Sequence, residues 1–213
     1  ETAIGLFPDV GGGYFLSRVD HFLGTYLALT GKTLDGDNSI FAKIGTHIIE
    51  DNLVDECVKQ ILDLKKYTKY DIDNILKKYD KKNKTQPSLE KELPDISKYF
   101  NKKSIKEIIN SLKAENSIWC KEQLNILEKK SPTSMGVATR QLDISRSLNL
   151  KDCLSMEFRI CQAMMDRHDF YEGVRANLVD KDRDPKWKPI TVDSLEEKLI
   201  DDHFKNLQEK ELF

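Results

Sequence analysis

The first fifteen residues constrain the fold and the chemistry of this chain more than any other stretch. Glu1 and Asp9 stand on either side of a short apolar segment, and residues 11–13 are all glycine, at the expected start of a helix. Three consecutive glycines permit a tight turn and a close approach of the backbone. Two carboxylates beside accessible backbone N–H groups are typical of acid–base chemistry on a carbonyl compound.

The overall charge is nearly balanced. The 213 residues include 34 basic and 36 acidic side chains, which gives a net charge of −2. Such a chain has no field that would draw it to nucleic acid or to a membrane surface. No apolar run approaches the ~20 residues that a membrane-spanning helix needs. We therefore predict a globular protein with neither a nucleic-acid nor a membrane partner.

Composition divides the chain into three segments, 1–65, 66–103 and 104–213. Lysine pairs occur at 65–66, 77–78, 81–82 and 102–103. A nucleic-acid surface is one interpretation of this lysine-rich stretch. Acidic residues alternate with the lysines and cancel their field, which favours a solvated helical insertion instead.

Periodicity predicts a mostly helical chain with a small β contribution at its N-terminal end. Short strands are expected over residues 2–7 and 46–49. Gly31 stands where a helix end is expected, and Pro132 suits a first helical turn. Helices are expected around the apolar clusters at 14–19, 22–29, 40–44, 53–64, 105–112, 119–127, 148–165 and 169–178.

The four cysteines indicate reduced thiols rather than a disulfide framework or a metal site. None belongs to a CxxC pair, and no histidine stands at zinc-ligand spacing from any of them. Buried or half-buried free thiols suit a reducing compartment. The cysteines are Cys57, Cys120, Cys153 and Cys161.

Spacing alone leaves two interpretations of Glu1 and Asp9. A fully extended chain would separate them by up to roughly 28 Å, but Pro8 and the glycines favour a reversal that brings both into one pocket. Alternatively, Glu1 is a frayed terminus and Asp9 caps the helix after the glycines. Phosphate binding by the glycines is disfavoured, because neither GxGxxG nor GxxxxGK[ST] is present.

The run ETAIGLFPDVGGGYFL over residues 1–16 resembles part of the active site of the crotonase (enoyl-CoA hydratase/isomerase) superfamily, and most of all its 3-hydroxyisobutyryl-CoA hydrolase branch. Hydratases commonly have glycine where this chain has Asp9, which favours the hydrolase. The resemblance spans nearly the whole chain and thins over residues 65–103. Further similar segments lie at 29–31 with Ala42 and Gly45, at 131–134, at 167–175 and at 180–189.

The resemblance implies an α/β crotonase-like fold and hydrolysis of an acyl-CoA thioester in valine breakdown. Glu1 would be a general base or a nucleophile, and Asp9 would bind the substrate's hydroxyl or assist proton transfer. Coenzyme A is then part of the substrate, so no separate cofactor and no metal are expected. Ile4, Leu6 and Phe7 predict an apolar wall beside these carboxylates.

The family's two thioester-polarising N–H groups lie upstream of the segment that aligns with Glu1. The resemblance therefore implies that this chain is a C-terminal portion, inactive without the N-terminal half of the enzyme as its partner. It also implies mitochondrial residence and leaves a homo-oligomer open. Two alternatives remain: an enoyl-CoA hydratase or isomerase, and a non-catalytic helical binding module in which both carboxylates are merely solvated.

Several other polar residues have two interpretations. His168 is either catalytic or, more simply, a structural hydrogen-bonding residue. Trp187 and the neighbouring lysines are either contacts for the nucleotide end of coenzyme A or a solvated loop anchored by one tryptophan. These lysines are Lys181, Lys186 and Lys188.

Overall fold

The computed structural model describes residues 1–81, 86–208 and 211–212. Packing divides the chain into two compact units: unit 1 is Glu1–Lys32 with Leu93–Phe213, and unit 2 is Thr33–Glu92. These boundaries reflect contacts, whereas the segments 1–65, 66–103 and 104–213 reflect composition. The lysine-rich stretch contributes helices to both units, and Lys82 lies outside the described residues.

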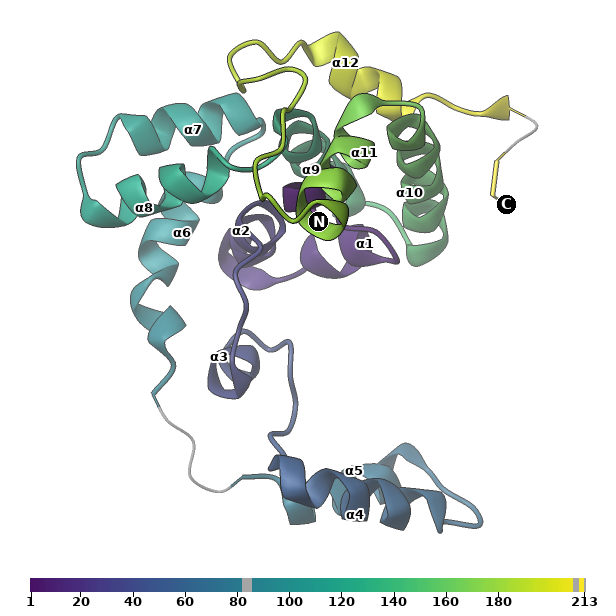
Figure 1. Cartoon of the computed structure of the whole chain (residues 1–213). Helices are drawn as coiled ribbons and strands as arrows, with labels where there is room; N and C mark the ends of the chain where they lie inside the picture. Colours follow the sequence, from purple (N-terminus) through teal and green to yellow (C-terminus); the bar gives the residue numbers. More distant parts are fainter. Residues whose placement is uncertain (82–85, 209–210, 213) are drawn as a thin grey trace. The chain divides into compact units, whose positions relative to one another are not determined.

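Helices form the regular structure of both units (Figure 1). Unit 2 contains α3 (Gly36–Phe41), α4 (Asp51–Leu62), α5 (Lys69–Tyr79) and the 3₁₀ turn η3 (Ser88–Lys91). Unit 1 contains η1 (Thr2–Ile4), α1 (Gly12–Leu16), η2 (Asp20–Phe22), α2 (Leu23–Thr30), α6 (Leu93–Phe100), α7 (Ile105–Lys113), α8 (Ile118–Leu127), α9 (Pro132–Ser145), α10 (Leu150–Met165), α11 (His168–Val174), the π-helical η4 (Arg175–Val179), α12 (Glu197–Asp201) and η5 (Asp202–Phe204).

The expected β contribution is not found. Residues 2–4 form a 3₁₀ turn, and Gly5 reverses the chain with φ of 73°. In the other expected strand, Ile49 makes only an isolated antiparallel bridge with Asp80, and the described residues contain no strand. The apolar run at 2–7 is buried against helices instead of a sheet, a distinction that periodicity cannot make for so short a run. Phe7, for example, is buried.

Helix α9 forms the centre of unit 1. It packs against α1, α2, α7 and α12, and its residues 132–139 are all buried. Gly136 is needed there, because a Cβ would come within 2.8 Å of Leu195 and 2.9 Å of Ile200. The N-cap is Ser131, whose hydroxyl accepts from the N–H of Ser134, with Pro132 at the first turn as predicted.

An aromatic cluster joins α2, α6 and α8. The rings of Tyr26 and Phe100 meet edge to face at 5.0 Å, and Trp119 stacks on Tyr26 at 6.1 Å. Gly31 ends α2 in the left-handed conformation, with φ of 71°, which confirms its predicted position. No described helix is both long and apolar enough to cross a membrane.

Unit 2 is built from local polar contacts around few buried side chains. Asn38 links α3 to η3, because its side-chain oxygen accepts from the N–H of Leu89 at 2.8 Å. Helices α4 and α5 pack together, and a capping box of Thr68 and Asp71 begins α5. Within the lysine-rich stretch 66–103, the described helical segments are α5, η3 and α6.

Candidate active site

The loop that carries Asp9 has a strained backbone. Val10 and Gly11 both have positive φ, 48° and 86°. The N–H of Gly12 donates to the carbonyl of Asp9 at 2.7 Å, which closes the turn before α1. Val10 is almost fully exposed at its tip, at 90%. A β-branched residue in the left-handed region is unfavourable by itself, so other contacts must fix this loop.

Glu157 of α10 supplies those contacts. Its carboxylate accepts from the N–H of Gly11 at 2.7 Å and from that of Gly13 at 2.9 Å. Gln141 of α9 donates both to the carbonyl of Pro8, at 2.7 Å, and to Glu157, at 3.2 Å. The Asp9 loop is therefore anchored on both sides of the carboxylate.

Gly13 is the residue that admits this network. A Cβ at this position would lie 2.6 Å from the amide nitrogen of Gln141 and 3.0 Å from both Glu157 and Ser145. The neighbouring Gly12 would bring its Cβ only against Pro8, at 3.1 Å. Within the glycine run, the third position therefore has the strictest steric requirement.

Burial raises the pKa of Glu157, against the opposing effect of the N–H groups of Gly11 and Gly13 and the amide of Gln141. The charge of Asp9 raises this pKa further. Burial and the charge of Asp9 likewise raise the pKa of the Cys161 thiol. The Asp9 carboxylate thus lies within electrostatic reach of a buried carboxylate and a half-buried thiol.

The sequence left open whether Glu1 and Asp9 share one pocket, and the structure describes different local surroundings for the two residues. Glu1 is exposed at the start of η1, where its carbonyl accepts from the N–H of Ile4 at 3.0 Å and of Leu6 at 3.2 Å. Asp9 is half-buried on its own loop. No hydrogen bond or ion pair among the described residues joins their side chains. Asp9 also does not cap α1, whose N-cap is Gly11.

The glycine N–H groups are not available to a ligand. Those of Gly11 and Gly13 donate to Glu157, and that of Gly12 donates to Asp9. The expectation that they face a carbonyl compound, and the disfavoured phosphate alternative, are therefore wrong for these atoms. The partner that sequence reasoning missed is Glu157. Its signal was a carboxylate within the buried face of α10, between Met156 and Ile160.

The segment after Glu1 is held by distant residues. The carbonyl of Thr2 accepts from the N–H of Ser131 at 3.0 Å, and the hydroxyl of Ser131 donates to Asp169 at 2.6 Å. A Cβ on Gly5 would lie 2.2 Å from the carbonyl oxygen of Asp169, and one on Gly173 would lie 2.2 Å from that of Ile4. Backbone therefore touches backbone where η1 meets α11.

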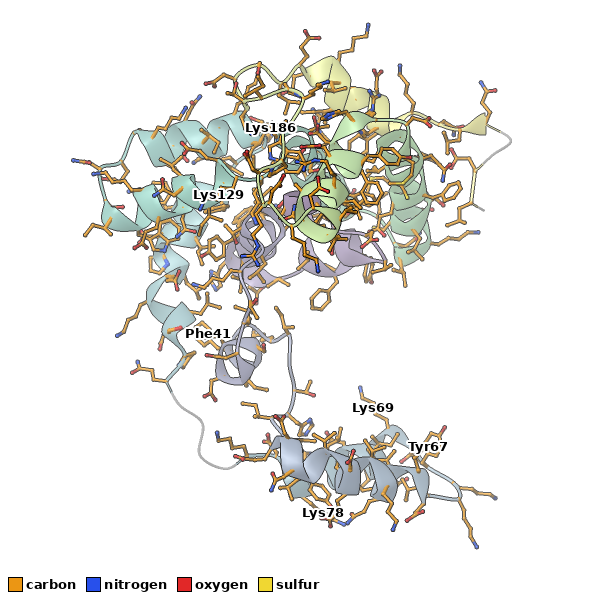
Figure 2. The ribbon with its side chains drawn as sticks, viewed as in Figure 1. Phe41, Tyr67, Lys69, Lys78, Lys129 and Lys186 are labelled. Atoms are coloured by element: carbon orange, nitrogen blue, oxygen red, sulfur yellow. The ribbon has the colours of Figure 1, made fainter. Side chains whose placement is uncertain are left out.

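The C-terminal loop is anchored from inside the unit. Trp187 is 7% exposed, and its indole N–H donates to the carbonyl of Lys129 at 3.2 Å. Figure 2 shows Lys129 and Lys186 in this part of unit 1. This confirms the anchoring interpretation of Trp187. The lysines Lys181, Lys186 and Lys188 are exposed.

Arg175 closes the same loop. Its guanidinium binds both carboxylate oxygens of Glu172 at 2.9 Å and reaches Asp180 at 2.7 Å and Asp182 at 2.6 Å. The bond from Arg175 lowers the pKa of Glu172 to about 2. Ahead of this cluster, His168 lies 3.2 Å from the carboxylate of Asp169.

Thiols and candidate metal ligands are dispersed. All four cysteines are free, and Cys57, Cys120 and Cys153 are buried, as predicted. Among the described residues, no group of three or more histidine, cysteine or acidic side chains could hold a metal ion. The titratable side chains that the structure brings close together are instead those of Asp9, Glu157 and their neighbours.

The chain is similar to a set of curated hydrolases. It is 41% identical over 216 residues to the bovine protein named 3-hydroxyisobutyryl-CoA hydrolase, mitochondrial, and 42% identical to the human protein of that name. The Dictyostelium discoideum protein of that name is 43% identical over 97% of this chain. The chain is covered completely by the first two matches but spans only 56% of the length of those relatives.

Solved structures share the fold. A carnitinyl-CoA dehydratase from Mycobacterium thermoresistibile superimposes on the whole chain and 59% of its own, with a TM-score of 0.87 and 28% identity. An enoyl-CoA hydratase from Rhodobacter sphaeroides gives 0.82 at 24% identity, over the whole chain and 60% of its own. The family model described as enoyl-CoA hydratase/isomerase matches residues 1–204. The chain belongs to the enoyl-CoA hydratase/isomerase family.

Proposed function

We propose that this chain is the C-terminal portion of a mitochondrial 3-hydroxyisobutyryl-CoA hydrolase that acts in valine breakdown. The observation that carries the proposal is the similarity of the whole chain, at about 40% identity, to curated proteins of that name. The substrate is then a short branched hydroxyacyl thioester. Coenzyme A enters as part of that substrate, with no separate cofactor.

In the proposed reaction, water adds to the thioester carbonyl carbon and the C–S bond breaks. Glu1 takes the proton from water as general base, or attacks the carbonyl itself to form an anhydride that water then cleaves. Asp9 binds the hydroxyl of the acyl group or transfers a proton to the leaving thiolate. The products are free coenzyme A and the hydroxy acid.

The anchored loop supports the role of Asp9. Gln141 and Glu157 hold the backbone on both sides of Asp9, so the position of the backbone that carries its carboxylate is fixed. Fixing a catalytic group in advance is worth a large part of a reaction barrier.

The proposed active enzyme needs residues beyond this chain. The relatives are longer, and the family's oxyanion donors precede the segment that aligns with Glu1. Losing one such donor typically lowers the rate by ~10²–10³. We therefore expect the 213 residues alone to be inactive and to require the N-terminal half as partner; assembly into a homo-oligomer is part of the same proposal.

The test is thiol release by the full-length protein carrying Asp9→Asn. We expect release of coenzyme A from 3-hydroxyisobutyryl-CoA to fall by at least about 10²-fold, the scale of a lost acid–base group. Asp143→Asn is the matched control, because it makes the same change at an exposed position of α9. It should leave the rate unchanged.

Three outcomes would count against the proposal or the role of Asp9. Hydration of crotonyl-CoA without thiol release would make the protein an enoyl-CoA hydratase, like the solved relatives. Full thiol release by the Asp9→Asn variant would remove the carboxylate from the mechanism. Absence of both activities in the full-length protein would favour a non-catalytic helical binding module.

A further inference from the structure

Unit 1 contains a cavity away from the Asp9 loop. It lies between α9, α11, the end of α10 and η5, and its volume is about 220 Å³. An apolar cavity of about 150 Å³ is enough to bind benzene, so this space admits a small organic molecule. Part of its wall is apolar, formed by Met164, Phe170 and Leu199.

Three polar atoms in the cavity lining have no hydrogen-bond partner in the described structure. They are the hydroxyl of Ser134, Nε2 of His203 and Nε of Arg167. Ser134 and His203 are both fully buried. Buried polar groups in folded proteins are almost always paired. Unpaired buried atoms also occur at Gln123, Gln141 and Ser145, but the three atoms in the cavity lining gather around one space.

The hydrogen bonding of His203 fixes what its free nitrogen can do. Nδ1 lies 2.7 Å from the carbonyl of Leu199, and a carbonyl only accepts, so Nδ1 carries the proton. Burial lowers the pKa of His203 and keeps the ring neutral at pH 7. Nε2 therefore carries a lone pair for which the described residues supply no donor.

The other two groups complement this acceptor. The Nε–H of Arg167 is a charged donor, while its Nη2 lies 3.8 Å from Asp202. The Ser134 hydroxyl can donate as well. Lys188 and His168 line the same cavity and are exposed, so they face its open side.

The carboxylate of Asp169 in the lining already accepts hydrogen bonds on both oxygens. The two oxygens of Asp169 accept from the hydroxyl of Ser131 at 2.6 Å and from the backbone N–H of Lys188 at 2.8 Å. The side chains of Arg167 and Lys188 add two positive charges to the lining. The cavity lining thus contains one buried acceptor, two donors, two cationic side chains beside one carboxylate, and an apolar wall.

We propose that this cavity binds a short-chain hydroxycarboxylate. The ligand's hydroxyl donates to His203, its carboxylate accepts from Arg167 and Ser134, and its carbon chain lies on the apolar wall. The lining includes neither Glu1 nor Asp9. The choice of 3-hydroxyisobutyrate as the probe rests on the proposed function, because it is the acid that the proposed hydrolase releases.

The experiment titrates the full-length protein with 3-hydroxyisobutyrate, isobutyrate and 2-methyl-1-propanol. Calorimetry gives the affinities, and the ¹⁵N resonance of His203 Nε2 reports occupation of this cavity alone. Each titration is repeated in the Asp9→Asn background, where cavity binding should persist. We expect the two analogues, which lack the hydroxyl or the carboxylate, to bind at least about tenfold more weakly, since each leaves buried polar groups unpaired.

Three variants localise the site. Ser134→Ala and Arg167→Lys should each weaken 3-hydroxyisobutyrate binding about tenfold. Both should fold, because the first removes an unpartnered hydroxyl and the second keeps a cation beside Asp202. Ser145→Ala is the matched control: Ser145 is equally buried on α9, its hydroxyl is also unpartnered, and it does not line the cavity.

The results separate a binding site from a space that holds only water. A shift of the His203 resonance that requires both hydroxyl and carboxylate, lost in Ser134→Ala but kept in Ser145→Ala, supports the proposal. An unchanged His203 resonance at saturating ligand overturns it. Equal affinity for isobutyrate, or equal loss in the Ser145→Ala control, overturns it as well.

Discussion

Two glutamates in unit 1 fix loops by opposite means. Glu157 is buried and accepts hydrogen bonds from uncharged donors, the N–H groups of Gly11 and Gly13 and the amide of Gln141. Glu172 is paired with the guanidinium of Arg175. Burial raises the pKa of the first, and the cation lowers the pKa of the second to about 2.

The opposite pKa shifts show whether desolvation or hydrogen bonding dominates at each glutamate. Neutral donors offset only part of the desolvation of Glu157, so removing that carboxylate from water remains the larger effect. Around Glu172, a charged partner outweighs desolvation. The Asp9 loop is therefore held by burial and geometry, while the C-terminal loop is held by charge.

The largest effect is expected from Glu157→Ala. It leaves the part-buried N–H of Gly11 and the buried N–H of Gly13 without an acceptor, so the free energy of unfolding should fall by about 2–5 kcal/mol. Denaturant unfolding of the purified protein measures this. Glu122→Ala, at an exposed position of α8, should change nothing measurable. Equal stability of Glu157→Ala and the unaltered protein would show that the network does not hold the loop.

A smaller effect is expected from Gly13→Ala. The new Cβ would come within 2.6 Å of Gln141 and 3.0 Å of Glu157, and overpacking of this kind typically costs about 1–3 kcal/mol. Gly12→Ala is the matched control, because its Cβ meets only Pro8, at 3.1 Å. Thermal unfolding of both variants would rank them. A larger loss in Gly12→Ala would contradict the described packing.

The pH dependence should have opposite signs for the two glutamates. The raised pKa of Glu157 adds stability at low pH, and this contribution is lost as pH rises above the ordinary 4.5 through the folded-state pKa. The lowered pKa of Glu172 adds stability above 4.5, which is lost as pH falls towards 2.

Stability curves of Glu157→Gln and Glu172→Gln against pH test these signs. The advantage of the unaltered protein over Glu157→Gln should shrink as pH rises above 4.5. Its advantage over Glu172→Gln should shrink as pH falls below 4.5. If both stability differences changed with pH in the same direction, burial and ion pairing would not shift the pKa values of Glu157 and Glu172 in opposite directions.

The smallest effect on global stability is expected from Arg175→Lys. One ammonium cannot reproduce the two-pronged bond to Glu172 together with the contacts to Asp180 and Asp182. We expect faster proteolytic cleavage within residues 180–186 and little change in Tm. Arg183→Lys, on the same exposed loop, is the control. Equal cleavage rates in both variants would show that Arg175 does not close the loop.

Local signals in the sequence predicted local structure well. Gly31 ends α2, and Pro132 lies in the first turn of α9, because such positions depend on backbone conformation that neighbouring residues determine. The apolar run at 2–7 was misassigned as a strand, since its burial against helices depends on residues far along the chain. The resemblance identified the family from the residues around Asp9.

The candidate site was only partly predictable. Asp9 was singled out, but its anchor was not, because Glu157 is 146 positions from Gly11 in the chain and spacing says nothing about such a contact. The glycine run suggested accessible N–H groups, and only the folded structure shows their acceptors. A single carboxylate on the buried face of α10 was the one available signal.

The contact of Gly5 and Gly173 with the opposite backbones has a consequence for the order of folding. This contact closes a loop over most of the chain. Closing such a loop costs conformational entropy before the contacts between its ends can stabilise the structure. The turn after Glu1 therefore reaches its final position only after α11 has been synthesised. A ribosome-bound chain that ends before Gly173 cannot complete the backbone surroundings of Ile4 and Gly5.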